Sequence, residues 1–249
     1  MSAMVFVGWD VGGWNCDKNP SSRDALVLLD DQRRPLGKPW RGNLRAVFND
    51  ATTGAELVEA VLDLCQVETA IGERPTLLFA IDTPLGFSTP FIGLVVHGRA
   101  VDTLGASSSN PYLHRKTEHF LFQRGLSPLS PLKDMIGSQA TKGLHFLARY
   151  AAQVERCGVW TDGQGLTAIE AYPSACKRSA YIETLRAPFR TAREATHTEA
   201  LPVHQDIDDA LTCALIGWTF RHAPDRLAQP DASIDPREGW IFVPLDGLR

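Results

Sequence analysis

The sequence predicts an α/β protein whose central sheet contains both antiparallel and parallel strands. Residues 4–42 contain strand-length apolar runs joined by short turns, which is typical of antiparallel neighbours. Farther along the chain, apolar runs alternate with helical patterns, which is typical of strands joined by crossover connections. Together these observations predict a mixed sheet packed against helices.

The first half of the chain contains the clearest secondary-structure signals. Three strands are expected in succession, at residues 4–10, within 24–37 and within 35–42. Residues 53–65 predict a helix, because Thr53 and Glu56 fit a capping box and the apolar residues after them recur at helical spacing. A fourth strand is expected at residues 76–82.

The second half is expected to contain a mostly helical segment, around residues 90–160, with a polar loop at 104–112 that is either mobile or functional. Three more elements follow: a strand within 166–174, a helix at 206–222 and a strand at 239–244. A length of 249 residues suits one large domain. We therefore expect a single domain over residues 1–249, with the helical segment as an insertion.

Composition limits the classes of function. The net charge is -4, whereas general nucleic-acid binders are usually basic, so such a role must rest on local patches. The five cysteines form no CxxC pair, which argues against a disulfide framework or a structural zinc site and fits a reducing cytoplasm. No apolar run approaches the ~20 residues of a membrane span, and no leader pattern begins the chain, so we expect a cytoplasmic protein.

Acidic residues end three of the apolar runs, each just before a chain breaker: Asp10, Asp82 and Glu170. Ligand crevices of open α/β sheets lie at the carboxyl ends of the strands, so these acids are expected to converge there. A cluster of buried carboxylates implies a cation, a shared proton or wide access to solvent, and oxygen-rich clusters suit Mg²⁺ or Mn²⁺ rather than zinc. The alternative for any single acid is an ordinary turn residue.

The helix expected at 206–222 begins with Asp206, Asp208 and Asp209. Asp209 continues a line of buried apolar residues at helical spacing, so we favour it as a metal ligand, with Asp206 one turn earlier beside it. Asp208 points elsewhere and suits a plain cap. The alternative is that all three acids only stabilise the helix N-terminus.

Five motifs resemble an uncharacterised family of predicted nucleases with a ribonuclease H-like fold: "GWDVGGWN", "AIDTPLGF", "YLHRKTEHFL", "IEAYPSA" and "DIDDALTCAL". The resemblance extends from near residue 5 to near residue 220. It implies a sheet of five strands, the first three antiparallel, with helices on both faces. Because fold does not imply function, the activity of the family is an expectation here.

The resemblance also implies the site. Asp10, Asp82 and Asp209 match the acids that bind two divalent ions in the wider superfamily. Asp206 matches an extra acid of the Holliday-junction resolvase branch, and Glu170 belongs to the family's own pattern as a catalytic candidate. The implied chemistry is two-metal hydrolysis of phosphodiester bonds in DNA or RNA.

Substrate-binding residues are expected around this site. Gly12 and Gly13 would let a phosphate or its metal approach the backbone, with a plain tight turn as the alternative. Arg115 and Thr117 match the family's tyrosine-arginine-threonine-acid segment. A basic cluster would hold the phosphate chain, or else form a solvated helix face: Lys177, Arg178, Arg186, Arg190 and Arg193.

Two other classes of function stay open. The turn "DVGG" also resembles the phosphate-binding turn of actin-like and sugar-kinase-like phosphotransferases, although a second Gly-rich turn is absent from the sequence. A non-catalytic, metal-stabilised domain that binds nucleic acid or protein is the third class. The apolar segment 90–98 fits a lid, a dimer surface or packing on the sheet, and the sequence does not choose among these.

Overall fold

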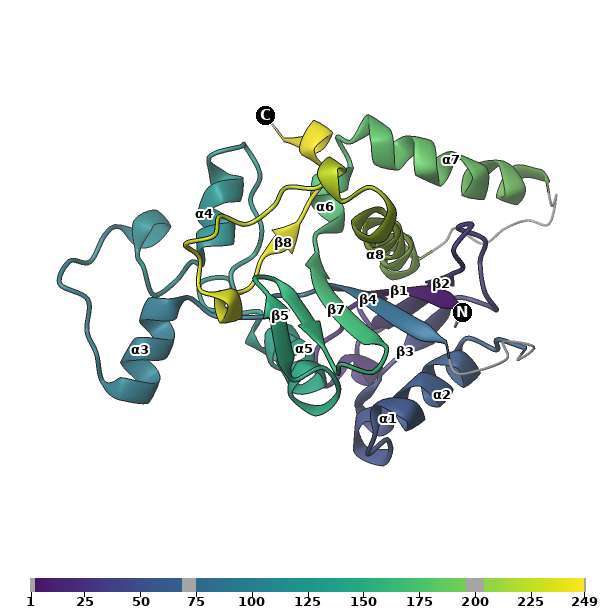
Figure 1. Cartoon of the computed structure of the whole chain (residues 1–249), viewed down its shortest axis with the longest axis horizontal. Coiled ribbons are helices and arrows are strands. Elements are labelled where there is room, and N and C mark those ends of the chain that lie inside the picture. Colours follow the sequence, from purple (N-terminus) through teal and green to yellow (C-terminus); the bar gives the residue numbers. More distant parts are fainter. Residues whose placement is uncertain (1–2, 69–74, 196–203, 249) are drawn as a thin grey trace.

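The computed structural model describes residues 3–68, 75–195 and 204–248, with the side chains of 190–195 excepted. Its eight strands belong to one sheet, with the order β3-β2-β1-β4-β7-β6-β5 and with β8 paired to β7 (Figure 1). Their bounds are β1 Met4–Asp10, β2 Asp24–Leu29, β3 Trp40–Gly42, β4 Thr76–Asp82, β5 Gln153–Arg156, β6 Val159–Thr161, β7 Leu166–Ala171 and β8 Ile241–Phe242.

The sheet is mixed, as the sequence predicts. Strands β1, β2 and β3 pair antiparallel, whereas β4 pairs parallel with β1 and with β7. The expectation of five strands is wrong for the sheet as a whole, because the described residues contribute eight. The hairpin of β5 and β6 lies inside the segment expected to be mostly helical. Its strands span only four and three residues around Gly158, too short for a periodic signal.

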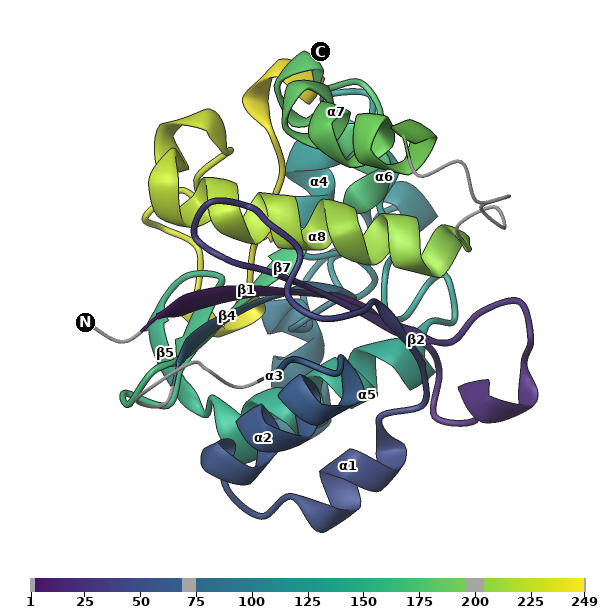
Figure 2. The ribbon, with the colours of Figure 1, turned by 90° about the vertical axis from the view of Figure 1, so that its right-hand side faces the viewer.

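Eight α-helices are found in the described residues: α1 Arg45–Asp50, α2 Gly54–Leu64, α3 Thr89–His97, α4 Lys116–Phe122, α5 Gly137–Tyr150, α6 Pro173–Cys176, α7 Ala180–Ala195 and α8 Gln205–His222. Helices α7 and α8 cover one face of the sheet, and α1, α2 and α5 cover the other (Figure 2). The capping box of α2 is confirmed, with Thr53 and Glu56 bonded to each other's backbone. None of the described helices has the length and apolarity needed to cross a membrane.

Strands β1 and β4 are apolar between their ends because helices cover both of their faces. Alternate residues belong to two separate apolar cores. Phe6 and Leu78 pack in the core on the α8 side, whereas Val7 and Phe79 pack in the core on the α2 and α5 side. This alternation of period two fixes the face on which each residue at the strand ends lies.

Helix α8 packs across β1, β2 and β4 at unusually short range. A Cβ atom on Gly8 would lie 1.8 Å from the carbonyl oxygen of Ala210, so only glycine allows the helix to approach strand β1 this closely. The contact brings the first turn of α8 near the carboxyl ends of β1 and β4.

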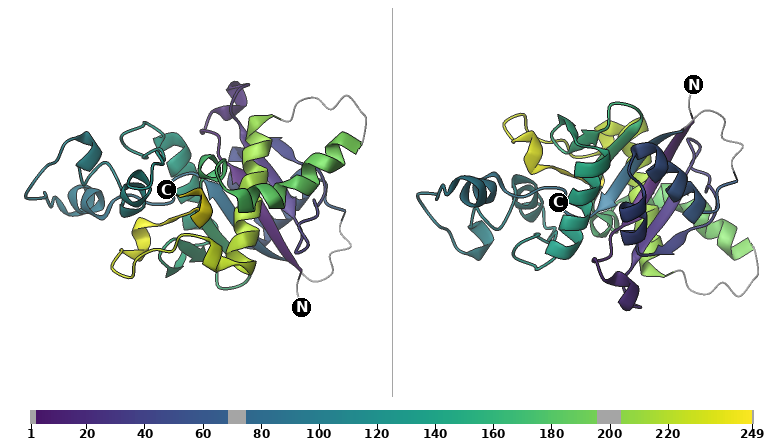
Figure 3. Two further views of the ribbon diagram at one scale, coloured as in Figure 1. Left: turned by 90° about the horizontal axis from the view of Figure 1, so that it is seen from above. Right: turned by 90° about the horizontal axis from the view of Figure 1, so that it is seen from below.

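Helix α3 belongs to a segment that projects from the rest of the molecule (Figure 1 and Figure 3). None of its nine residues is buried, and Val95 and Val96 are 65% and 63% exposed. The N-terminus of α3 is held by Glu238, whose Oε2 accepts from the backbone N–H of Thr89 at 3.1 Å. The segment 90–98 therefore does not pack on the sheet.

Candidate functional site

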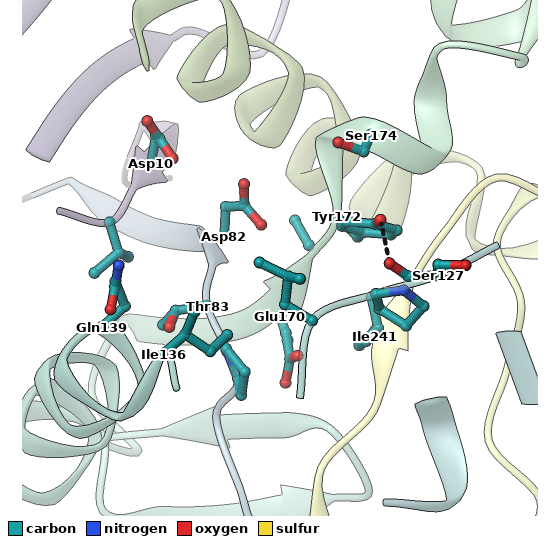
Figure 4. A pocket seen from close by; sticks show the side chains of 15 residues that line it. Asp10, Asp82, Thr83, Ser127, Ile136, Gln139, Glu170, Tyr172, Ser174 and Ile241 are labelled. Carbon is teal, nitrogen blue, oxygen red and sulfur yellow. Dashed lines mark hydrogen bonds between the residues drawn. The ribbon is translucent and has the colours of Figure 1, made fainter. Parts of the chain in front are cut away.

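Asp10 and Asp82 are the last residues of two adjacent parallel strands, and their Cα atoms are register partners. Asp10 has the same parity as Phe6, and Asp82 has the same parity as Leu78, so both side chains lie on the α8 face of the sheet. Figure 4 shows the two carboxylates directed toward the same space. The convergence expected from the sequence is therefore present for these two acids.

A pocket of about 410 Å³ opens beside the two acids (Figure 4). Its wall opposite the strands is formed by the loop between α4 and α5, through Ser127, Pro128 and Leu129. The remaining lining residues are Val11, Thr83, Pro84, Ile136, Gln139, Glu170, Ala171, Tyr172, Ser174 and Ile241. A volume of this size is within the range of small-ligand sites.

The carboxyl groups of the site shift one another's pKa values. Burial and the neighbouring carboxylates of Asp82, Asp206 and Asp209 raise the pKa of Asp10 to about 9. Burial and the charges of Asp209 and Glu170 raise the pKa of Asp82 to about 8. Without a cation, both carboxyl groups hold a proton near neutral pH, because neighbouring negative charges in a half-buried site repel each other.

Asp209 belongs to the same electrostatic group. It lies just after the first turn of α8, burial raises its pKa, and the nearby Lys177 opposes this effect. Its Oδ2 accepts one hydrogen bond, from Nε2 of Gln205 at 3.4 Å. In this arrangement, no three of the described His, Cys, Asp and Glu side chains lie close enough together to form a complete metal site.

Asp206 and Asp208 are held by arginines. Oδ2 of Asp206 accepts from Nε of Arg41 and from the backbone N–H of Arg23, both at 2.8 Å. Asp208 pairs with Arg186 on the outer side of α8, as expected for a residue that points away from the site. The structure therefore brings Asp206 near Asp10 but commits one of its oxygens to a cationic side chain.

Glu170 faces the other side of the sheet. Its neighbour Ile169 packs in the core on the α8 side, so strand alternation turns Glu170 away from Asp10 and Asp82 (Figure 4). Both carboxylate oxygens accept from the guanidinium of Arg115, each at 2.7 Å, and Oε2 also accepts from the backbone N–H of Leu85 at 2.9 Å. Glu170 thus lines the pocket while its charge is already paired.

Arg115 and Thr117 lie inside the protein, away from any substrate in solution. Arg115 is 1% exposed, and its guanidinium also pairs with Glu118 at 2.6 Å. The hydroxyl of Thr117 accepts from the backbone N–H of Ile241 at 3.0 Å, which ties α4 to β8. Lys177 is exposed beside Asp209. Arg190 and Arg193 have side chains outside the described set.

The turn at Gly12 and Gly13 is built on a buried ion pair that the sequence reasoning missed. Lys142 and Asp24 are both fully buried and form a salt bridge. Nζ of Lys142 donates to the carbonyl oxygens of Gly12 and Gly13, at 3.3 and 3.4 Å, and Asp24 Oδ1 accepts from the N–H of Gly12 at 2.9 Å. The Gly12 amide is therefore already bonded within the protein.

The tight packing of this turn explains why residue 12 is a glycine. A Cβ on Gly12 would lie 2.7 Å from the backbone nitrogen of Asp24. A signal for the missed lysine was present in the sequence, because Lys142 stands at i, i+4 and i+8 spacing with Phe146 and Tyr150 on the buried face of α5. A lysine within an apolar stripe indicates a buried partner.

Comparison with known proteins gave no match to a family model, to a curated protein or to a solved structure.

Proposed function

We propose that this protein is a Mg²⁺- or Mn²⁺-dependent nuclease that hydrolyses phosphodiester bonds of DNA or RNA. The observation that carries the proposal is the pairing of Asp10 with Asp82 at the ends of adjacent parallel strands, facing a pocket. Two like charges this close, each with a pKa raised to about 9 or about 8, are most simply stabilised by a divalent cation.

The donor set fits Mg²⁺ or Mn²⁺ better than a softer metal. Mg²⁺ commonly binds one or two protein carboxylates and completes its shell with water and substrate phosphate, so a site with few protein ligands is ordinary for it. Asp10 and Asp82 would hold the cation, with Asp209 beside them. When bound, the cation lowers the pKa of a water and neutralises charge on the phosphoryl oxygens.

The other residues have supporting roles in this proposal. Glu170 and Arg115 fix the end of β7 against the segment before α4 and keep the floor of the pocket in place. Asp206 ties the first turn of α8 to strand β3 through its bond with Arg41. Lys177 contributes positive charge at the edge of the acidic group, where a phosphate chain would pass.

We also propose that the five contiguous strands β3, β2, β1, β4 and β7 are a ribonuclease H-like core. Their first three members are antiparallel and helices cover both faces, as the resemblance implies. The hairpin of β5 and β6 and the short β8 would then be additions to that core.

Calorimetric titration of Mg²⁺ and Mn²⁺ tests the proposal directly. The wild type is compared with the double variant Asp10→Asn/Asp209→Asn. The matched control is Asp208→Asn, which alters the acid next to Asp209 on α8, and that acid pairs with Arg186 of α7. All three are then incubated with labelled single-stranded, duplex, junction and RNA substrates. We expect metal binding and cleavage to be lost together in the double variant and retained in the control.

Two results would contradict the nuclease proposal. If the wild type binds neither ion at millimolar concentration, the acids are structural caps and the nuclease proposal fails. Cleavage that survives the double substitution would also contradict it, because the cation would then have lost Asp10 and Asp209 and kept Asp82 alone.

A further inference from the structure

Apart from its acidic residues, the pocket beside Asp10 and Asp82 is lined by uncharged side chains. Its described lining contains no Lys, Arg or His, and its third carboxylate, on Glu170, is already paired with Arg115. A phosphate could therefore be neutralised only at the edge formed by Asp10 and Asp82, by a cation. The rest of the volume of about 410 Å³ suits an uncharged part of the ligand.

One polar atom in this pocket needs a partner. The hydroxyl of Thr83 lies next to Asp82, the residue is 5% exposed, and Oγ1 has no hydrogen-bond partner among the described residues. A buried hydroxyl without a partner costs free energy, so such atoms usually mark a bound water or a ligand. Thr83 therefore indicates that the ligand offers a hydrogen-bonding group next to Asp82.

The other walls of the pocket are apolar or aromatic. Leu129 lines the pocket and remains 54% exposed, so its side chain is open to contact with a ligand. Tyr172 also lines the pocket, and its hydroxyl donates to the carbonyl oxygen of Ser127 at 3.1 Å, which fixes the ring against the loop that carries Leu129 (Figure 4). A flat ligand with polar edges matches these surfaces.

We propose that this pocket receives one unpaired nucleobase of the strand whose phosphate lies at Asp10 and Asp82. This assignment rests on the proposed nuclease function and names its substrate class, a single strand or an unpaired nucleotide within a duplex. Nucleobases combine apolar faces, which stack on aromatic and apolar side chains, with hydrogen-bonding edges, which Thr83 would meet. A base stacked in an intact duplex cannot enter a pocket of this size.

The first test needs neither a metal nor a phosphate. Adenosine, which is uncharged, is titrated in the presence of EDTA and followed by NMR, with ribose as the probe that lacks a base. We expect adenosine, and not ribose, to shift the signals of Thr83 and Tyr172. The variants Thr83→Val and Tyr172→Leu should weaken binding, the second by about 5- to 150-fold because it removes the aromatic surface. Val95→Ala, on the projecting helix α3, is the control that should bind as the wild type does.

The second test uses the unaltered protein, so it does not depend on the folding of a variant. A single-stranded oligonucleotide with one abasic position, moved along the strand, is incubated with the protein and Mg²⁺. We expect cleavage to fall at least about fivefold only when the abasic position is next to the cut phosphate. A fully paired duplex should be cut more slowly than a duplex with one unpaired nucleotide at the same position.

The outcomes separate the two proposals. Mg²⁺ binding and cleavage with no effect of the abasic position, or with equal cutting of paired and unpaired nucleotides, would overturn the pocket assignment and leave the nuclease function intact. Adenosine binding without any metal binding or cleavage would overturn the nuclease function and, with it, the assignment of the base to a cut strand. Equal shifts from adenosine and ribose would overturn base recognition itself.

Discussion

Arg115 donates to both carboxylate oxygens of Glu170, with two nitrogen-oxygen distances of 2.7 Å, across 55 positions of sequence. The same guanidinium pairs with Glu118, so one cation serves two buried carboxylates. Bidentate pairing of this kind is geometrically specific as well as strong. It joins the start of α4 to strand β7. Glu170, expected to be catalytic, and Arg115, expected to bind substrate, thus have a structural role in this pair.

Replacement of Arg115 by methionine is expected to lower the free energy of unfolding by about 3–5 kcal/mol, because two buried carboxylates would lose their partner. Urea unfolding at neutral pH measures the loss. Arg34→Met is the control: Arg34 pairs with Asp30 at 2.7 Å, but its side chain is 74% exposed, so a loss of no more than about 1 kcal/mol is expected. Equal losses of unfolding free energy in the two variants would show that the buried ion pairs of Arg115 stabilise the protein no more than an exposed pair does.

The metal-free protein is expected to lose stability as pH rises. The folded-state pKa values of Asp10 and Asp82 are about 9 and about 8, against 3.8 for an ordinary aspartate, so between these limits the folded state holds protons that the unfolded state has released. The free energy of unfolding should therefore fall as pH rises above about 4 and continue to fall until about 9.

Unfolding in EDTA at a series of pH values measures this dependence. The variant Asp10→Asn/Asp82→Asn should flatten it and should be the more stable protein at pH 8, by a few kcal/mol, because one pKa unit corresponds to about 1.4 kcal/mol. A stability that rises from pH 5 to pH 8 in the wild type and in the variant alike would contradict the raised pKa values.

Gly8→Ala should be severely destabilising. The new methyl group would lie 1.8 Å from the carbonyl oxygen of Ala210, and backbone cannot yield as a flexible side chain can, so α8 must move off strand β1. We expect a loss of about 3 kcal/mol or more in the free energy of unfolding. Gly93→Ala is the matched control, since the nearest atom, Cβ of Arg99, is 4.0 Å away and alanine should stabilise helix α3 by about 0.5–1 kcal/mol. A mild effect at Gly8 would mean that α8 packs less closely than described.

Lys142→Met should cost about 3–5 kcal/mol, because Asp24 would be left charged in a fully buried position. Adding Asp24→Asn should recover part of the loss, since the amide oxygen can still accept from the N–H groups of Trp9 and Gly12. Denaturant unfolding of the two single variants and the double variant gives the coupling energy. Losses that simply add would show that Asp24 and Lys142 do not interact.

The positions of Asp10 and Asp82 could be predicted because a local signal combines with a general rule of open α/β sheets. Each acid ends a long apolar run, and parallel neighbours bring such ends to one edge of a sheet. The direction of Glu170 could not be predicted, because it depends on the register of β7 within the finished sheet, and a shift of one residue reverses the face. The same pattern, an apolar run with an acid near its end, therefore gave two acids that face the site and one acid, Glu170, on the opposite face of the sheet.

The hairpin of β5 and β6 and the pair of Asp24 with Lys142 were missed for a common reason. Each depends on contacts between distant segments rather than on local periodicity: β6 becomes a strand by pairing with β7, and Lys142 is buried only because Asp24 lies opposite. Tertiary context of this kind overrides local signals. Only the position of Lys142 within an apolar stripe gave a local indication.

The distance along the chain between Asp24 and Lys142 has a consequence for biosynthesis. The two residues are 118 positions apart, so the turn at Gly12 and Gly13 cannot close on its lysine until α5 has left the ribosome and reached the sheet. Contacts that span so much sequence form late, because loop closure must precede them. Strand β1 is synthesised first, yet the turn at its carboxyl end takes its final shape only after α5 has been made.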